Sequence, residues 1–153
     1  MKRSPLLVKL AALTAALLLV ALGALHLYWI FGGQWGLVAA TPLVDGQPVL
    51  EVSARPGFFG LVFLCFMGAY VLLCRGGLLG QALLPGFYSG GTWALIVLLI
   101  ARAVGDFRSV GLFAPKTDTP FSWYESHLTI PLCLGLAALC LIVAVFSPRR
   151  DPE

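Results

Sequence analysis

Four long apolar runs, separated by polar or glycine-rich segments, dominate the pattern of residues along the chain. The runs cover about residues 6–30, 57–74, 83–104 and 128–146. A helix needs about 20 apolar residues to cross the hydrocarbon core of a membrane, and each run approaches or exceeds that length. The pattern therefore predicts an all-α integral membrane protein, with four transmembrane helices that form one domain.

The polar segments between the runs differ in length. Two of them, about residues 31–56 and 105–127, are long, whereas the second and third runs are joined by the short, glycine-rich stretch RGGLLGQALLP. A short connection makes the helices that it joins antiparallel neighbours. We therefore expect an antiparallel four-helix bundle with no separate soluble domain.

Small residues indicate where these helices approach one another, because helices in lipid associate through close packing. The candidate contact positions are Ala12, Ala15, Ala16 and Gly23 in the first helix, and Gly86 and Gly90 in the third. Alanine and glycine are also common in membrane helices in general, so these residues either mark helix contacts or only reflect that general composition.

The positions of Lys and Arg predict the orientation, because cytoplasmic segments carry an excess of both. With four helices, the two chain ends and the short connection share one side, which holds Lys2, Arg3, Lys9, Arg75, Arg149 and Arg150. The other side holds Arg55, Arg102, Arg108 and Lys116. We expect both termini in the cytoplasm, and the two long segments on the outer face of a bacterial inner membrane.

The first apolar run also has one feature of a signal peptide, since Lys2, Arg3 and Lys9 precede it. Its length argues against that interpretation, because the apolar region of a signal peptide has about 7–15 residues. The small-x-small candidate at Ala21 to Gly23 is followed by more apolar chain. We therefore predict that the run is a transmembrane helix.

The composition agrees with a membrane protein and excludes a soluble domain. Of the 153 residues, 59% are hydrophobic and 11% are charged, whereas charged residues approach about a quarter of a soluble domain. The net charge of +3 comes from the segments that flank the helices, so it does not predict nucleic-acid binding. The cysteines form no CxxC pair, and packing is favoured over redox or metal chemistry at Cys65, Cys74, Cys133 and Cys140.

The first run changes character in the stretch ALHLYWIFGGQWG, residues 24–36. About 20 residues into the run, the helix reaches the outer boundary of the hydrocarbon. Tyr28 and Trp29 then lie where lipid meets water, a depth that both residue types prefer, and the glycines after them let the backbone turn. His26 is different, because an ionisable group at this depth normally faces the bundle or a wet cavity.

The other outer helix ends carry charged groups. In ARAVGDFRSVG, Arg102 and Asp106 are four residues apart, so they can pair if the third helix continues; Gly105 redirects Asp106 if it ends the helix. In WYESHL, Glu125 lies near the start of the fourth helix, where its charge complements the helix dipole.

Polar and aromatic groups thus converge on one predicted depth. The candidate acid–base residues are His26, Asp106, Glu125 and His127. The candidate ligand-binding residues are Tyr28, Trp29, Trp35, Arg102, Arg108 and Trp123. Neither an HxxxH nor an HExxH spacing supports a metal site, so we predict none, and the sequence identifies no cofactor.

The stretches HLYWIFGGQWG and RAVGDFRSVG together resemble a bacterial family of small four-helix membrane proteins, domain of unknown function 3995. The family pattern has a His-x-Tyr-Trp run with a Gly-Gly and Trp-Gly turn, and later an Arg-Ala-x-Gly-Asp-Phe-Arg run. The matching positions are His26, Tyr28, Trp29, Gly33, Trp35, Gly36, Arg102, Gly105, Asp106, Phe107 and Arg108. The resemblance implies the four-helix topology, and it implies no activity, substrate or cofactor.

Two hypotheses on function follow. In the first, the outer polar layer binds or processes a lipid or an amphipathic small molecule. In the second, the chain is a non-enzymatic membrane subunit or scaffold, in which the same residues only staple helix ends together. Transport ranks third, because no strongly polar residue lies near the predicted midplane. The lipid bilayer is the one partner that the sequence predicts; protein partners are not identified, and nucleic acid is not expected.

Overall fold

The computed structural model describes residues 5–41, 43–44, 47–48, 57–80, 85–107 and 110–147. Four helical stretches in this part of the chain are long and apolar enough to cross a membrane, which confirms the prediction of four apolar helices. Three of them are the single helices α1 (Pro5–Ile30), α3 (Gly57–Arg75) and α4 (Pro85–Val104).

The fourth helical stretch is composite. The short helix α5 (Pro120–Tyr124) leads into a π-helical turn, η2 (Glu125–Thr129), which continues as α6 (Ile130–Phe146). The side chain of Thr119 caps the start, because its Oγ1 accepts a hydrogen bond of 3.3 Å from the Ser122 amide. The helical path therefore begins well before residue 128, where the apolar pattern alone placed it.

Small elements follow α1. They are the one-turn helix α2 (Leu37–Ala40) and the two-residue strands β1 (Leu43–Val44) and β2 (Gln47–Pro48), which pair antiparallel. Apart from this pairing, the elements in the described part of the chain are helical, as the sequence predicts.

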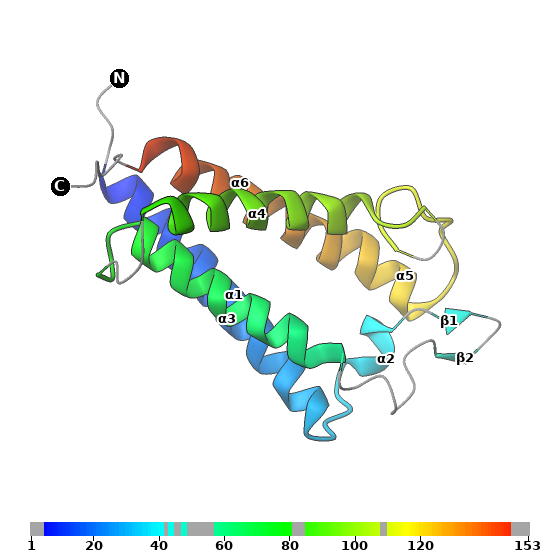
Figure 1. Ribbon diagram of the computed structural model, residues 1–153. Helices are drawn as coiled ribbons and strands as arrows, with labels where there is room; N and C mark the ends of the chain where they lie inside the picture. The colour runs from blue at the N-terminus through cyan, green and yellow to red at the C-terminus, as the bar shows by residue number, and fades with distance from the viewer. Residues whose placement is uncertain are drawn as a thin grey trace.

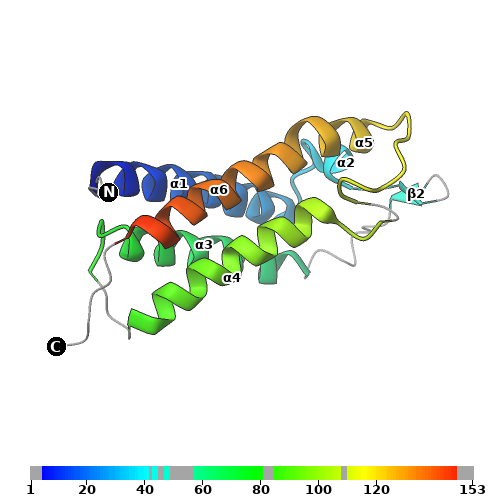
Figure 2. The same cartoon turned by 90° about the horizontal axis from the view of Figure 1, so that it is seen from above.

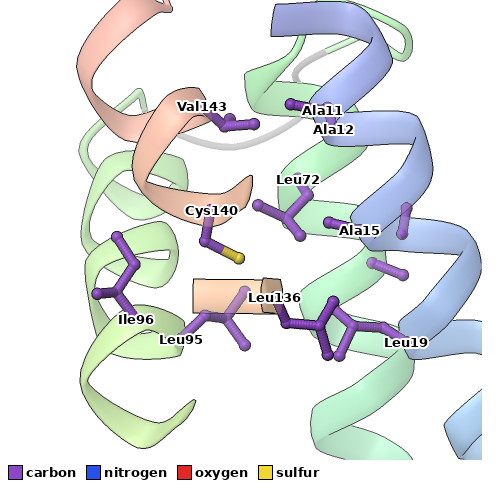
Figure 3. Close-up of a cluster of buried hydrophobic side chains, with 12 residues drawn as sticks. Ala11, Ala12, Ala15, Leu19, Leu72, Leu95, Ile96, Leu136, Cys140 and Val143 are labelled. Atoms are coloured by element: carbon purple, nitrogen blue, oxygen red, sulfur yellow. The ribbon is translucent and has the colours of Figure 1, made fainter. Parts of the chain in front are cut away.

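The four long helices lie side by side, with α1 packed along α3 and α4 packed along α6 (Figures 1 and 2). Buried side chains from all four meet in one core, and Figure 3 shows Leu72 of α3 and Cys140 of α6 facing Ala15 of α1. The four cysteines are free, and all but the half-buried Cys133 are buried.

Small residues bring α1 and α3 close together, as close packing in lipid requires. A Cβ atom added to Gly76 would lie 2.5 Å from that of Ala12, and one added to Gly23 would lie 3.2 Å from that of Cys65. The expectation for the third helix was wrong: Gly86 and Gly90 are exposed, and an added Cβ would meet nothing within 4 Å.

The bundle has two distinct ends. At one end the last turns of α1 and α4 lie with the first turns of α3 and α5, and we call this the loop end (Figure 1). The ring of His26 in α1 lies 5.4 Å from that of Phe58 in α3 there. At the opposite end, the Ser147 hydroxyl after α6 donates a hydrogen bond of 3.1 Å to the Arg75 carbonyl of α3.

Candidate functional site at the loop end

Two glycines fold the segment after α4 back onto the helix end. Gly105 has a φ of +80° and Gly111 a φ of +100°, a region that side chains other than glycine rarely adopt. The two backbones touch: a Cβ atom on Gly105 would overlap the carbonyl oxygen of Val110, and one on Gly111 would overlap that of Val104. Only glycine fits at both positions.

Hydrogen bonds close the loop that these glycines frame. The Asp106 amide donates to the Val110 carbonyl at 3.1 Å, and the Val110 amide donates to Oδ1 of Asp106 at 3.0 Å. The Leu112 amide then donates to the Ala103 carbonyl at 2.9 Å, which satisfies one of the free acceptors at the end of α4. Gly105 ends the helix, so Asp106 does not lie one turn beyond Arg102 on a helix face.

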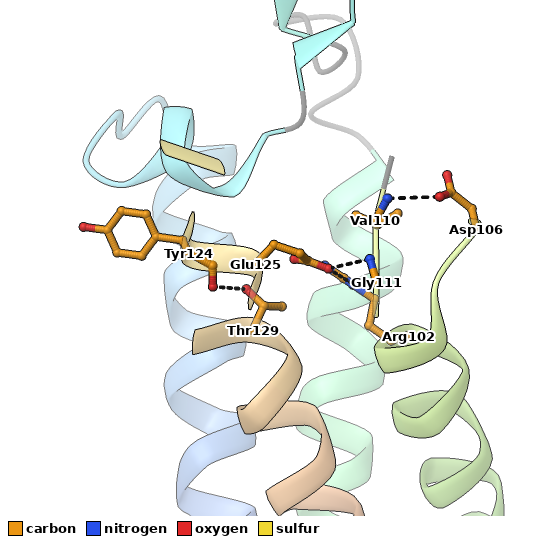
Figure 4. A network of polar contacts seen from close by, with 7 residues as sticks. All are labelled: Arg102, Asp106, Val110, Gly111, Tyr124, Glu125 and Thr129. Carbon is orange, nitrogen blue, oxygen red and sulfur yellow. Dashed lines mark hydrogen bonds and ion pairs between the residues drawn. The ribbon is translucent and has the colours of Figure 1, made fainter. Parts of the chain in front are cut away.

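Arg102 pairs with Glu125 instead (Figure 4). Its Nη1 and Nη2 atoms donate to Oε1 and Oε2 of Glu125 at 2.6 and 2.9 Å, which joins α4 to η2. The Gly111 amide adds a third bond, of 3.0 Å, to Oε1. The side chain of Glu125 is 5% exposed and that of Arg102 is 40% exposed, so the carboxylate is the buried member. We call Arg102, Gly111 and Glu125 the clamp.

The π-helical turn sets the position of Glu125. The Ile130 amide donates to the Glu125 carbonyl, five residues back, instead of to the carbonyl four residues back. The Thr129 hydroxyl lies 3.5 Å from the Tyr124 carbonyl at the same turn (Figure 4). Glu125 is therefore inside a continuous helical stretch, and its main partner is Arg102, not the dipole of a helix start as the sequence indicated.

The aromatic motif at the end of α1 forms a compact turn. The buried indole of Trp29, 5% exposed, donates from Nε1 to the Trp35 carbonyl at 2.9 Å. The Gly33 amide donates to the Tyr28 carbonyl at 2.9 Å, and the Tyr28 ring lies directly over Gly33, where a Cβ atom would overlap it. The Trp35 amide lies 3.4 Å from the Tyr28 hydroxyl, while the Trp35 side chain is exposed.

His26 lies between α1 and the start of α3. Its Nδ1–H donates to the Leu22 carbonyl, 2.7 Å away, because a carbonyl can only accept. Its ring meets the rings of Trp29 and Phe58 edge-on, with centroids 4.9 and 5.4 Å apart. These contacts are those of a packed histidine.

A different group of residues surrounds His127. Its Nδ1–H donates to the Trp123 carbonyl at 2.9 Å, and the two exposed rings stack 4.8 Å apart at an interplanar angle of 18°. Both line a shallow hollow of about 500 Å³ at the start of α5. We call it the Trp123 hollow, and its lining comprises Lys116, Thr117, Asp118, Thr119, Pro120, Ser122, Trp123, Ser126 and His127.

The structure thus divides the sequence-predicted residues into separate groups. Arg102 contacts Glu125, Trp123 contacts His127, and Trp29 contacts His26. Within the described ranges, no three His, Cys, Asp or Glu residues gather as a metal site. Arg108 lies outside the described residues.

Gly111 is the clamp residue that the sequence analysis missed. Its signal was the pair of glycines six positions apart in GDFRSVG, a spacing that fits a short closed loop. A second polar contact was also not predicted from the sequence: the Tyr70 and Tyr88 hydroxyls lie 3.3 Å apart, between α3 and α4.

Comparison with known proteins gives one result. A family described as "Protein of unknown function (DUF3995)" matches residues 19–140 of the chain, and both motifs lie within that range. No curated protein and no solved structure matches.

Proposed function

We propose that this chain, which belongs to the DUF3995 family, is a non-enzymatic multi-pass membrane protein in which the clamp stabilises the loop end of the bundle. The observation that carries the proposal is that hydrogen bonds engage both carboxylate oxygens of Glu125. Both carboxylate oxygens are bound by Arg102, and one also accepts the Gly111 amide. A buried charge needs such partners, because leaving it unpaired away from water is costly.

The contacts of three of the four predicted acid–base residues give little support to catalysis. A general base must reach the proton that it removes, and Glu125 is buried with its oxygens engaged. Asp106 is occupied by its own loop, where Oδ1 accepts from Val110. His26 donates from Nδ1 within its own helix. These contacts agree with a subunit or scaffold whose polar residues hold helix ends together.

The proposed placement is an antiparallel bundle in a bacterial inner membrane, with both termini in the cytoplasm and the loop end outside. The excess of Lys and Arg on the side of the termini supports this orientation. Reporter fusions after Arg75 and Glu153 should read as cytoplasmic, and fusions near Asp45 and Lys116 as external. An external C-terminus would overturn the orientation.

The clamp is tested by a double-mutant cycle in detergent. Arg102→Gln and Glu125→Gln should each lower the free energy of unfolding by about 2 kcal/mol, because each leaves one charge of the pair unmatched. The double variant should lose clearly less than the sum of the two, since both charges are then gone.

Asp118→Asn is the matched control, because it neutralises an exposed carboxylate at the same end that takes no part in the clamp. It should cost no more than about 0.5 kcal/mol. Full stability of the clamp variants together with a lost cellular phenotype would contradict the structural role and favour a functional site.

The other hypothesis, that the loop end binds a lipid or an amphipathic small molecule, keeps one observation in its favour. The Trp123 hollow is open, and it is lined by charged, hydroxyl and aromatic side chains that the clamp does not use.

A further inference from the structure

The Trp123 hollow lies at the depth of lipid headgroups if α5, η2 and α6 cross the membrane. Together they span Pro120–Phe146, or 27 residues. At 1.5 Å per residue, this stretch is about 40 Å long, roughly 10 Å more than the hydrocarbon core. Its first turns are the polar ones, and they carry the exposed Trp123 and Tyr124, residue types that favour the membrane–water boundary.

Hydrogen bonds and ring contacts connect the side chains that line the hollow. The Thr117 amide donates to the Ser122 hydroxyl at 3.1 Å, and the hydroxyls of Thr117 and Thr119 lie 3.0 Å apart. The Trp123 ring stacks against the His127 ring and meets the Tyr124 ring edge-on, with centroids 4.8 and 5.0 Å apart.

Opposite charges line the hollow without pairing with each other. Lys116 and Asp118 both lie in the described part of the chain, and no ion pair joins them. His127 uses Nδ1–H for the Trp123 carbonyl, which makes Nε2 an acceptor when the ring is neutral. The exposed indole of Trp123 adds an aromatic surface that attracts cations.

We propose that the Trp123 hollow binds the phosphoethanolamine headgroup of a phospholipid in the leaflet at the loop end. Lys116 binds the phosphate, and Asp118, His127 and Trp123 bind the primary ammonium group. The ammonium has N–H donors for Asp118 and for Nε2 of His127, whereas the trimethylammonium of a choline headgroup has none and a glycerol headgroup carries no positive charge. The volume of about 500 Å³ falls in the range of about 300–1,000 Å³ typical of small-molecule sites.

This inference rests on the proposed membrane placement of α5 and α6, and not on the clamp. Its test is lipid titration of the purified protein in detergent, read by native mass spectrometry. The probes are phosphatidylethanolamine, phosphatidylcholine and phosphatidylglycerol with identical acyl chains. We expect phosphatidylethanolamine to bind about fivefold more tightly than the other two. Equal binding of the three lipids would overturn the proposal.

Variants of Lys116 and Asp118 test the phosphate contact and the ammonium contact separately. Lys116→Gln should weaken all three phospholipids by about threefold, because each carries the phosphate. Asp118→Asn should weaken only phosphatidylethanolamine and reduce its preference, since His127 and Trp123 still contact the ammonium. Asp106→Asn, an acidic residue at the same end but outside the hollow, should change nothing. A preference of unchanged size in Asp118→Asn would overturn the proposed ammonium site.

Two further measurements keep the outcomes distinct. The thermal midpoint of each hollow variant should equal that of the wild type, because none of these side chains belongs to the clamp; failure of the clamp would appear as lost stability and not as lost selectivity. Soluble phosphoethanolamine should compete weakly, because it lacks the acyl chains that hold a lipid at this depth. Binding of soluble phosphoethanolamine as tight as that of the lipid would overturn the lipid source.

Discussion

The sequence motifs that follow α1 and α4 at the loop end are stabilised by different kinds of contact. Each ends one of the four long apolar helices, and each uses glycines with positive φ, Gly32 and Gly36 after α1 and Gly105 and Gly111 after α4. After α1, aromatic side chains cover the turn. After α4, backbone lies directly against backbone, and a buried carboxylate binds the returning loop.

The two motifs also differ in how far apart in sequence their bonded residues are. In the α1 turn, the bonds of Trp29 and Tyr28 to Trp35 join residues six and seven positions apart. In the clamp, Arg102 and Glu125 are 23 positions apart and belong to different helices. The α1 turn is therefore a local cap, whereas the clamp is a tertiary contact that holds α4 against the start of the fourth helical stretch.

The largest effect is expected from variants that disrupt the clamp through its backbone. Gly105→Ala and Gly111→Ala should each lower the free energy of unfolding by about 3 kcal/mol or more, because the added Cβ combines strained φ with overlap against a carbonyl. Thermal unfolding in detergent measures the loss.

The matched control is Gly60→Ala in α3. Gly60 is an exposed helical glycine, and an added Cβ would meet nothing within 4 Å, so stability should stay the same or rise slightly. If Gly105→Ala is tolerated as well as Gly60→Ala, the close backbone contact does not hold the loop.

A medium effect is expected in the local cap. Trp29→Phe keeps an aromatic ring but removes the Nε1–H that binds the Trp35 carbonyl, and it leaves a void in a buried site. We expect a loss of about 2 kcal/mol. Trp35→Phe is the control, because the side chain of Trp35 is exposed and only its backbone takes part; it should cost less than about 0.5 kcal/mol. Similar losses in both variants would mean that the Trp35 ring also stabilises the turn.

The smallest effect is expected at His26. Gln can replace the hydrogen bond to Leu22, so His26→Gln loses mainly the ring contacts with Trp29 and Phe58. The cost should be about 1 kcal/mol or less, with normal insertion and an unchanged cellular phenotype. A folded His26→Gln protein that has lost its phenotype would return His26 to the candidate site residues and weaken the scaffold proposal.

The apolar pattern was sufficient to predict the four helices that are long and apolar enough to cross a membrane, and the glycines marked where two of them end. These features are local, because helix-forming apolar length and positive φ depend on a residue and its near neighbours. The same is true of the compact turn after α1, whose interacting residues are all in one short stretch.

The partner of Arg102 could not be predicted in this way. Asp106 was the nearest acidic residue in sequence, but Gly105 turns it away, and the packing of α4 against α6 brings Glu125 within 2.6 Å. The π-helical turn that places Glu125 and the Gly111 amide that binds it also leave no periodic signal. Tertiary structure decided the clamp, because an ion pair between helices depends on how their axes are placed in space, which the order of residues in either helix does not specify.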